Sequence, residues 1–296
     1  MDIIKINGHS GYIPGNTNVG VYSYKDGYCL LVDSGINNTT GRKISDGLAG
    51  AGLKPRYLIN THSHTDHYGG NRVLAELYPG LSFYTSPIEA AFMKINELES
   101  YSLYGARPYK GIRDEMFFTK EFHIDGTLLP GTAEFGDRKF QVIPLRGHTM
   151  GQIGIITDDG VAYIGDSIFD DKRLSRYVPF LYDIKSEYET LGTLEKTEAD
   201  YFVLGHADEV YEDIRPLVKR NKDNLDEYIG IILELLEQPK TMEGLASEVF
   251  ILKDIEIDVK RYYTCMAGIK AFVSFLLDEG EISNNVQDGK MFFFRI

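Results

Sequence analysis

The sequence predicts an α/β protein in which two β-sheets pack as a sandwich, helices cover the outer faces of both sheets, and a small helical region follows. Three observations predict this fold. Strand-type segments rich in Val, Ile, Leu and Tyr fill two separate parts of the chain, helical segments accompany each part, and the composition turns helical from about residue 214. With 296 residues, the chain has the length for one large domain, or for one domain with an appendage.

The first half begins with strand-type segments that end at turn residues. The expected elements are strands at 17–24, 28–35 and 56–60 and a helix near 41–52. A second helix follows, because Val73, Leu74 and Leu77 recur at helical spacing before a Pro-Gly pair stops the pattern. The histidine-rich segment THSHTDHYGG, residues 61–70, therefore falls on a loop between a strand and a helix.

The second half repeats the alternation of strands with a helix. The expected strands lie in EFHID (121–125), KFQVIPLRGHT (139–149), GQIGIITDDG (151–160), VAYIGDS (161–167) and YFVLGH (201–206), with a helix near 186–198. His123, within EFHID, is expected to be a strand residue. Two halves of this kind are typical of stacked sheets with helices outside.

Residues 86–118 lie between the two halves and predict a lid-like insertion. The segment is helical in PIEAAFMKINELES and then loses its periodicity, while it forms a locally basic run. Its tyrosines and cations suit a clamp over an anionic substrate, although a loop that needs aromatic packing has the same composition. The candidate lid residues are Tyr101, Tyr104, Arg107, Tyr109, Lys110 and Arg113.

The last part of the chain predicts three helices and a β-hairpin, an order similar to that of a winged-helix module. The helices are expected in NLDEYIGIILELLEQ, TMEGLASEVF and VKRYYTCMAGIKAFVSFLLDEG, and the hairpin in EISNNVQDGKMFFFRI. We place a first domain at 1–215 and a winged-helix-like domain at 216–296. Residues 220–296 hold 9 basic and 14 acidic residues, so we expect packing or homodimer formation there rather than DNA binding.

The composition argues against several classes of protein. A formal net charge of −13 disfavours a broad surface that follows phosphates, so nucleic acid is a weak candidate partner. No stretch reaches about 18 uninterrupted apolar residues, and the N-terminus has no basic segment before an apolar core. We therefore expect a cytoplasmic protein with no membrane association. Cys29 and Cys265 match no metal or redox spacing, which predicts two buried, reduced thiols.

The loop at 61–70 gathers three histidines and one aspartate within six residues. Crowding removes these groups from water, and a divalent metal ion is the obvious partner for their lone pairs. Alternate side chains of an extended segment share a face, so His62 and His64 can bind one ion, while Asp66 and His67 are turned away by the bend into the helix. One short loop can thus serve two neighbouring metal ions.

Four further residues stand in a common setting, at the end of an apolar strand and beside a glycine. They are Asp33 in VDSG, His148 in VIPLRGHT, Asp166 in VAYIGDS and His206 in YFVLGH. Together with the histidine-rich loop, this pattern includes five of the seven histidines, and strand ends hold side chains rigidly enough for catalysis. His9 falls outside the pattern and is expected in a solvated loop.

With these motifs in order across about residues 1–215, the sequence resembles the metallo-β-lactamase superfamily. The resemblance implies an αββα sandwich, the metallo-β-lactamase fold, with two divalent metal ions at one edge. The implied ligands are His62, His64 and His148 for a first ion, Asp66, His67 and His206 for a second, and Asp166 as a bridge between them. Asp33 would orient a ligand histidine or the loop that contains Asp66.

The chemistry that this resemblance implies is hydrolysis. Zinc is the expected metal, with iron or manganese as alternatives. Two ions lower the pKa of a shared water, so that a metal-bridging hydroxide attacks a small ester, thioester or related acyl substrate. Two carboxylate ligands against four positive charges leave a positive centre, which suits an anionic small molecule. Asp66 is the candidate catalytic residue, because a carboxylate beside the metals can assist the leaving group.

Two positions separate branches of the family. His64 stands where the flavodiiron branch has a carboxylate, and Asp166 stands where true β-lactamases have cysteine or serine. Both favour the glyoxalase II-like hydrolases, and the helical tail is similar to that of β-lactamase-like protein 2, although no clear counterpart of the basic glutathione-binding residues is evident there. Three alternatives stay open: a phosphodiesterase or ribonuclease of the same fold, a mononuclear-iron persulfide dioxygenase-like enzyme, and a non-enzymatic metal-dependent module.

Overall fold

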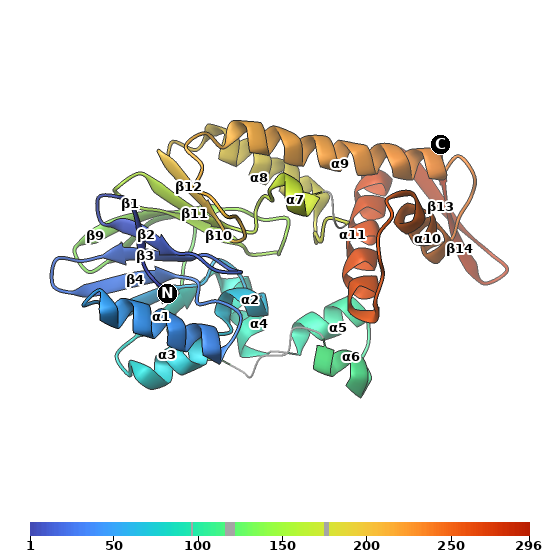
Figure 1. Cartoon of the computed structure of the whole chain (residues 1–296). Helices are drawn as coiled ribbons and strands as arrows, with labels where there is room; N and C mark the ends of the chain where they lie inside the picture. Colours follow the sequence, from blue (N-terminus) through green and yellow to red (C-terminus); the bar gives the residue numbers. More distant parts are fainter. Residues whose placement is uncertain (96, 116–121, 175–177) are drawn as a thin grey trace.

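The computed structural model describes residues 1–95, 97–115, 122–174 and 178–296, and it has a layered architecture (Figure 1). The first sheet has the order β1 (Ile4–Asn7), β2 (Ser10–Ile13), β3 (Val19–Ser23), β4 (Tyr28–Val32), β5 (Lys54–Ile59), β6 (Ser82–Thr85) and β7 (Gly126–Thr127). The second sheet has the order β12 (Tyr201–Leu204), β11 (Val161–Gly165), β10 (Ile153–Ile156), β9 (Arg138–Pro144) and β8 (Gly131–Phe135).

The helices between these strands begin at residues suited to that position. They are α1 (Asn38–Gly50), α2 (Thr65–Tyr68), α3 (Asn71–Leu77), α4 (Pro87–Lys94), α5 (Leu98–Tyr104), α6 (Lys110–Glu115), α7 (Asp171–Leu174) and α8 (Ile184–Lys196). The Asn37 side chain accepts a hydrogen bond from the backbone N–H of Thr40 at the start of α1. Asp183 does the same for two backbone N–H groups of α8. Such caps satisfy donors that the first helical turn leaves without partners.

The two sheets pack face to face through alternate strand residues. Tyr22 of β3 and Leu30 of β4 point into the layer between the sheets, where they join Phe140 of β9 and Tyr163 of β11 in one buried cluster. The rings of Tyr22 and Phe140 meet edge to face with centroids 5.0 Å apart. The Tyr163 hydroxyl donates a 2.7 Å hydrogen bond to the carbonyl of Gly11 in the opposite sheet. Apolar burial and this bond together hold the sheets in register.

Helices cover the outer face of each sheet. Leu31 of β4 packs in one buried cluster with Ile44 of α1 and Leu74 of α3. On the other sheet, Leu204 of β12 shares a cluster with Leu191 of α8. Adjacent residues of a strand therefore serve different cores, because side chains alternate between the two faces of a sheet. The resulting helix–sheet–sheet–helix order confirms the fold class that the sequence predicts.

One predicted strand is wrong. Residues 122–124 of the segment EFHID are not in a strand, and Glu121 lies outside the described residues. Pairing with β6 begins only at β7, because the Asp125 carboxylate accepts a 2.8 Å hydrogen bond from the N–H of Phe83, a role that a backbone carbonyl has within a sheet. His123 is accordingly not a strand residue, and its side chain is 85% exposed.

The chain beyond β12 forms the expected helices and hairpin. They are α9 (Arg215–Leu235), α10 (Met242–Leu252), α11 (Val259–Asp278), β13 (Ile282–Gln287) and β14 (Lys290–Arg295). The long helix α9 runs from the layer beside α8 to the C-terminal elements (Figure 1). Leu225 and Tyr228 of α9 share one buried cluster with Leu191 of α8 and Phe272 of α11. The predicted boundary at 215/216 falls at the first residues of α9 and stays a prediction.

Helix α11 also contacts the insertion between the two halves. Leu103 of α5 and Ile112 of α6 are buried together, with Tyr263 and Ala267 of α11 packed against them. Figure 1 shows α5 and α6 beside one end of α11, apart from the sheets. Helices α5 and α6 of the insertion therefore pack with helix α11 beside the sandwich.

Both cysteines are buried free thiols, as the sequence predicts. Burial raises the pKa of the Cys29 thiol to about 12 and that of Cys265 to about 11, so both are protonated at neutral pH. Within the residues that the structure describes, no helix combines the length and the apolar character that crossing a bilayer requires.

Candidate metal centre

The candidate ligands lie at one edge of the sandwich because the strands that precede them end there. His62 and His64 follow β5, His148 follows β9, Asp166 follows β11, and His206 follows β12. β11 and β12 run parallel, so their carboxyl ends meet at the same edge. β4 and β5 are also parallel, which brings Asp33 next to the histidine-rich loop. The short helix α2 then turns Asp66 and His67 toward the same edge.

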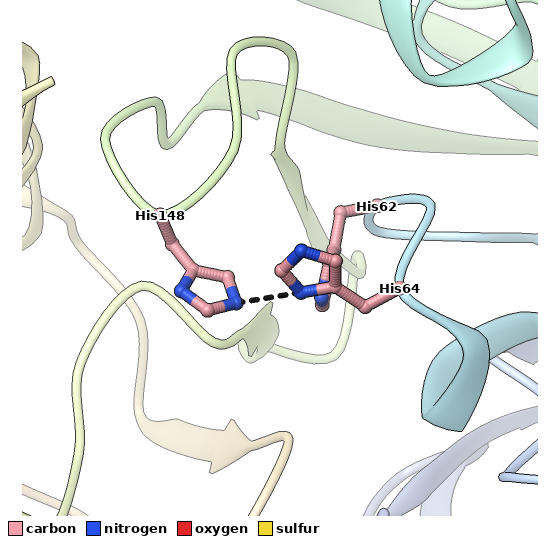
Figure 2. A group of neighbouring side chains, drawn as sticks. All are labelled: His62, His64 and His148. Carbon is pink, nitrogen blue, oxygen red and sulfur yellow. Dashed lines mark hydrogen bonds between the residues drawn. The ribbon is translucent and has the colours of Figure 1, made fainter. Parts of the chain in front are cut away.

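Three histidines form the first group of ligand-type side chains. One ring nitrogen of each of His62, His64 and His148 lies within 4.8 Å of the others, and all three residues are buried (Figure 2). Nε2 of His148 is 2.9 Å from Nδ1 of His64. Two imidazole nitrogens at this distance need a proton or a cation between them. The structure therefore brings together the three residues that the resemblance assigns to one metal ion.

The second group consists of Asp66, His67 and His206, whose ligand atoms are likewise within 4.8 Å of one another. Nε2 of His206 lies 3.1 Å from Oδ2 of Asp66 and 3.2 Å from Oδ2 of Asp166. The other oxygen of Asp166, Oδ1, is 3.2 Å from Nε2 of His67. Oδ2 of Asp166 is also 3.7 Å from Nε2 of His148, a member of the first group. The Asp166 carboxylate thus lies between the two groups.

Hydrogen bonds on the outer side orient several of these rings. Nδ1 of His67 bonds to Oδ2 of Asp33 at 2.8 Å, and Nδ1 of His148 bonds to the carbonyl oxygen of Phe180 at 2.9 Å. Nδ1 of His206 contacts the backbone carbonyl of Asn16. An acceptor at Nδ1 places the ring proton there and leaves the Nε2 lone pair facing the centre. This is the tautomer that binds a metal through Nε2.

His64 has the opposite orientation. Its Nε2 lies 3.6 Å from Oε1 of Glu99, on helix α5, and its Nδ1 faces His148. Glu99 also accepts a 2.8 Å hydrogen bond from the hydroxyl of Tyr182. The insertion at 86–118 therefore supplies a carboxylate that contacts a candidate ligand histidine, a role that was not predicted for it from the sequence.

The donor set fits divalent metal ions. Nε2 of His62 is buried and has no hydrogen-bond partner among the described residues. Nε2 of His67 and Oδ1 of Asp166 pair with each other at 3.2 Å, and these two residues form a further group of ligand-type side chains with His62. Leaving a buried polar atom without a partner costs about 1–3 kcal/mol, and a cation bound here would give the His62 nitrogen a partner. Imidazole nitrogen and carboxylate oxygen are the ligands that zinc, iron and manganese accept. The edge of the sandwich is therefore a divalent metal site.

Two members of the first group, His62 and His148, are held in the uncharged form that a metal requires, whereas Glu99 outweighs the burial of His64 and raises its pKa. Burial, together with the neighbouring His67 and His64, holds the pKa of His62 well below its ordinary value. Burial and the proximity of His64 lower the pKa of His148 to about 3. Both residues are therefore neutral at pH 7, with lone pairs available for a cation.

The second group binds protons while it has no metal. Burial acts to lower the pKa of His206, but Asp166 and Asp66 outweigh it and raise that pKa to about 10. The pKa of His67 is raised as well, because the carboxylates of Asp166 and Asp33 outweigh its burial. These two cations in turn hold the pKa of Asp166 low against the effect of its own burial. A metal ion that binds here must displace protons from His67 and His206.

A cavity of about 570 Å³ opens onto the centre. Its wall includes the ligand-type residues His64, Asp66, His148, Asp166 and His206, and an apolar part formed by Phe169, Leu174, Val178, Pro179 and Phe180. Arg173, together with Lys260 and Arg261 of α11, adds positive charge to the wall, although Asp258 lines it as well and lies 3.8 Å from Arg261. These three cations were not predicted from the sequence. The sequence did contain one signal for Lys260 and Arg261. Two adjacent cations in the first turn of a helix oppose the helix dipole, so their presence at the start of α11 is atypical.

The six candidate lid residues do not line this cavity. Tyr104 instead packs against Tyr263 of α11, with ring centroids 5.5 Å apart, and against Tyr109 at 6.4 Å. This is the aromatic packing that the sequence left open as the alternative. Residues 96 and 116–118 of the insertion lie outside the described residues. A lid function for the insertion stays a prediction. Residues of α11, rather than the six lid candidates, line the cavity.

The fold and the site together define an α/β sandwich protein with a divalent metal site at one edge. Residues 12–206 match the model of the Metallo-beta-lactamase superfamily, and the chain belongs to this superfamily.

Solved structures share the fold over nearly the whole chain. A beta-lactamase domain protein from Burkholderia ambifaria aligns with a TM-score of 0.78 and 18% sequence identity, covering 100% of this chain and 94% of that one. A metallo-beta-lactamase family protein from Thermus thermophilus aligns with a TM-score of 0.74 and 20% identity, covering 97% of each chain. At these identities the likeness shows the fold alone, and it includes the C-terminal helices.

Curated relatives match a shorter part of the chain. The hydroxyacylglutathione hydrolase of Gloeobacter violaceus is 29% identical over 153 residues, which are 49% of this chain and 50% of that protein. The protein of the same name from Buchnera aphidicola is 28% identical over 141 residues, covering 48% of this chain and 43% of that protein. The chain thus spans about half the length of the curated relatives it matches.

Proposed function

We propose that this chain is a dinuclear metal-dependent hydrolase that acts on a small ester, thioester or related acyl substrate. One observation supports the proposal above all. Two sets of three ligand-type side chains, with Asp166 between them, face a cavity large enough for a small molecule. The relatives named as hydroxyacylglutathione hydrolases support the same class of reaction.

The proposed ligands divide between two ions, zinc in the first place, with iron or manganese as alternatives. The first set is His62, His64 and His148, the second set is Asp66, His67 and His206, and Asp166 belongs to both. When bound, two such ions would supply a water of lowered pKa and polarise the substrate oxygen. Asp33 would hold His67 in the orientation that ligation requires, through the 2.8 Å bond to its Nδ1.

Asp66 is proposed to act on the leaving group as well as on a metal. Its side chain is 30% exposed, whereas that of Asp166 is 7% exposed. Asp66 also lines the cavity, so its carboxylate can exchange a proton with a substrate bound there. Asp166 also lines the cavity, but it is enclosed between His67 and His206 and is less exposed to a bound substrate.

The wall of the cavity favours a substrate with an apolar part and a negative charge. Phe169 and Phe180 provide apolar surface, and Arg173, Lys260 and Arg261 provide positive charge. Acylglutathione thioesters combine a reactive acyl bond with carboxylates, so they are the first compounds to test. We also propose a cytoplasmic location and a winged-helix-like role for residues 216–296 in packing or homodimer formation.

Elemental analysis of the natively loaded protein, followed by turnover assays, tests the proposal. The assay panel contains acylglutathione thioesters, lactones, β-lactams and phosphodiesters, with oxygen consumption on a glutathione persulfide as a separate measurement. We expect about two metal ions per chain and turnover of an acyl substrate. Phosphodiester cleavage alone, iron-dependent oxygen consumption, or a protein that binds no metal would each contradict it.

A further inference from the structure

Glu89, on helix α4, is a buried carboxylate that belongs to neither ligand group. The residue is 1% exposed. Its Oε2 accepts hydrogen bonds from the backbone N–H of Ser63 at 2.8 Å and from the Ser63 hydroxyl at 2.5 Å. Its Oε1 accepts from the Thr149 hydroxyl at 2.7 Å and from the backbone N–H of Gly151 at 2.8 Å. Four donors thus converge on one side chain.

These donors lie next to the three histidines of the first group. Ser63 stands between His62 and His64, and Thr149 follows His148 directly. Ser63 and Thr149 both lie in loops at the edge of the sandwich and belong to no strand. Glu89 therefore links the two loops that together contain every member of the three-histidine group.

The second group has a different support. The Asp33 carboxylate accepts from the backbone N–H of Thr61 at 2.8 Å, from the Thr61 hydroxyl at 2.9 Å, and bonds to Nδ1 of His67 at 2.8 Å. Of the hydrogen bonds described for Glu89, none goes to the second group. Asp33 thus bonds directly to the second group and reaches the first group only through the Thr61 hydroxyl, which lies 3.0 Å from Nδ1 of His62.

The local sequence alone gives Glu89 another role. Ser86 caps helix α4 and Glu89 is three residues later, the pattern of a capping box, in which the glutamate binds the backbone N–H of the cap residue. Here the backbone N–H of Glu89 contacts the Ser86 hydroxyl at 3.4 Å, while its carboxylate accepts hydrogen bonds from the loops that contain Ser63 and Gly151. The tertiary structure therefore uses this carboxylate outside its own helix.

We propose that Glu89 is a positioning residue that sets the geometry of the three-histidine metal site and leaves the second site unaffected. This inference rests on the proposed function, because it assumes that the first group binds a metal. Buried second-layer partners of this kind change metal affinity by about 10- to 100-fold when they are replaced. Glu89 differs from the usual case in that it holds the backbone beside the ligands rather than a ligand ring.

The substitution Glu89→Gln isolates this role, because the amide keeps the shape of the carboxylate. A carboxylate accepts at both oxygens, whereas an amide accepts at one and donates at the other. Either orientation of the amide leaves one backbone N–H, that of Ser63 or that of Gly151, opposite an NH₂ group. The hydroxyls of Ser63 and Thr149 can rotate to accept a hydrogen bond, but the backbone cannot. One of the two loops must therefore shift.

The experiment is a Co²⁺ titration of the metal-free full chain, with visible absorption spectra and competition against a chromophoric chelator. A His148→Ala variant identifies the spectrum and the affinity that belong to the three-histidine site. For Glu89→Gln we expect the Co²⁺ affinity of that site to fall by about 10- to 100-fold, with the affinity of the second site unchanged. Equal losses at both sites, or no loss, would overturn the proposal.

Two further variants separate positioning from stability. Ser86→Ala removes the cap of the same helix but none of the four bonds to the Glu89 carboxylate, so it should lower the unfolding temperature without changing the Co²⁺ spectrum. A loss in Ser86→Ala equal to that in Glu89→Gln would contradict the proposal. Ser63→Ala removes one donor only and should weaken the three-histidine site by less than Glu89→Gln does, which keeps the test valid if the glutamine variant fails to fold.

The outcome for the unsubstituted protein distinguishes the two proposals. If it binds no Co²⁺, the proposed function fails together with its metal site. If it binds Co²⁺ at two sites and Glu89→Gln binds with unchanged affinities, only the role of Glu89 fails.

Discussion

Replacing Asp33 by asparagine tests whether one buried carboxylate holds a ligand histidine in its metal-binding tautomer. Asp33 is 2% exposed and has a φ of 68°, a left-handed conformation that asparagine tolerates and alanine does not. The Asp33→Asn substitution would therefore change the charge and the hydrogen bonds while the backbone stays in place. Asp33→Ala adds the cost of the left-handed backbone, roughly 1–2 kcal/mol, and serves as the less specific comparison.

The expected magnitude follows from the three bonds that Asp33 accepts. Oδ2 faces both the Thr61 hydroxyl and Nδ1 of His67, and Oδ1 faces the Thr61 backbone N–H. An amide donor at the Oδ2 position drives His67 to the tautomer whose Nε2 carries the proton, which blocks ligation. A donor at the Oδ1 position leaves the Thr61 N–H without an acceptor. Losing one hydrogen bond to a charged group costs about 1.5–3 kcal/mol, or about 10- to 100-fold in metal affinity.

Metal titration calorimetry on the metal-free protein measures this effect, with chemical denaturation of the same samples as a check on folding. We expect the site that contains His67 to bind Zn²⁺ about 10- to 100-fold more weakly in Asp33→Asn, while the three-histidine site changes less. Unchanged binding at both sites in a folded variant would refute the reasoning, because it would mean that the Asp33–His67 bond does not set the ligand tautomer.

Three further predictions concern the same edge of the sandwich. His64→Ala or Asp166→Ala should abolish turnover of the acyl substrate and leave the far-ultraviolet circular dichroism spectrum largely intact; undiminished turnover in either variant would refute a dinuclear mechanism. Gly205→Ala should lower both metal content and turnover, because a Cβ there would lie 2.2 Å from Oδ1 of Asp166, and normal metal content by elemental analysis would contradict this. Metal-free protein should be most stable near pH 6.5, the ordinary histidine pKa, as far as His148 and His206 determine it. His148 has a folded pKa of about 3, so its contribution to the free energy of unfolding is complete above pH 6.5 and is lost as the pH falls toward 3. His206 has a folded pKa of about 10, so its contribution is complete below pH 6.5 and is lost as the pH rises toward 10. Denaturant titrations in excess chelator from pH 4 to pH 10 measure it, and a profile without a maximum would contradict the pKa directions.

Local patterns were sufficient to predict the layers and the places of the candidate ligands. The strand segments before Asp166 and His206 run apolar, and a glycine ends the first and follows the second, so the next side chain lies at the end of a rigid element. Two parallel strands that end together bring such residues to one edge. The incorrect strand at EFHID shows the limit of this reasoning, because the Asp125 side chain replaces a backbone partner there, and no local pattern indicates that.

The surroundings of the candidate ligands were not predictable in this way. Lys260 and Arg261 are about 190 residues from the histidine-rich loop in the sequence, and they line the cavity only because α11 packs beside the centre. Glu99 reaches His64 from the insertion, where sequence reasoning assigned the tyrosines and cations instead. Each contact depends on how separate elements pack, and packing is decided by the summed burial of many side chains.

By itself, the sequence indicated which residues could bind a metal, because ligand-type side chains follow apolar strand segments and the resemblance assigns them to two ions. Only the tertiary structure decided what holds and surrounds those residues: Glu89 joins the loops of the three-histidine group, Asp33 supports His67, and α11 forms part of the cavity wall. The physical reason is that a buried carboxylate takes whichever donors the packed fold brings within hydrogen-bond distance, and those donors come from distant parts of the chain.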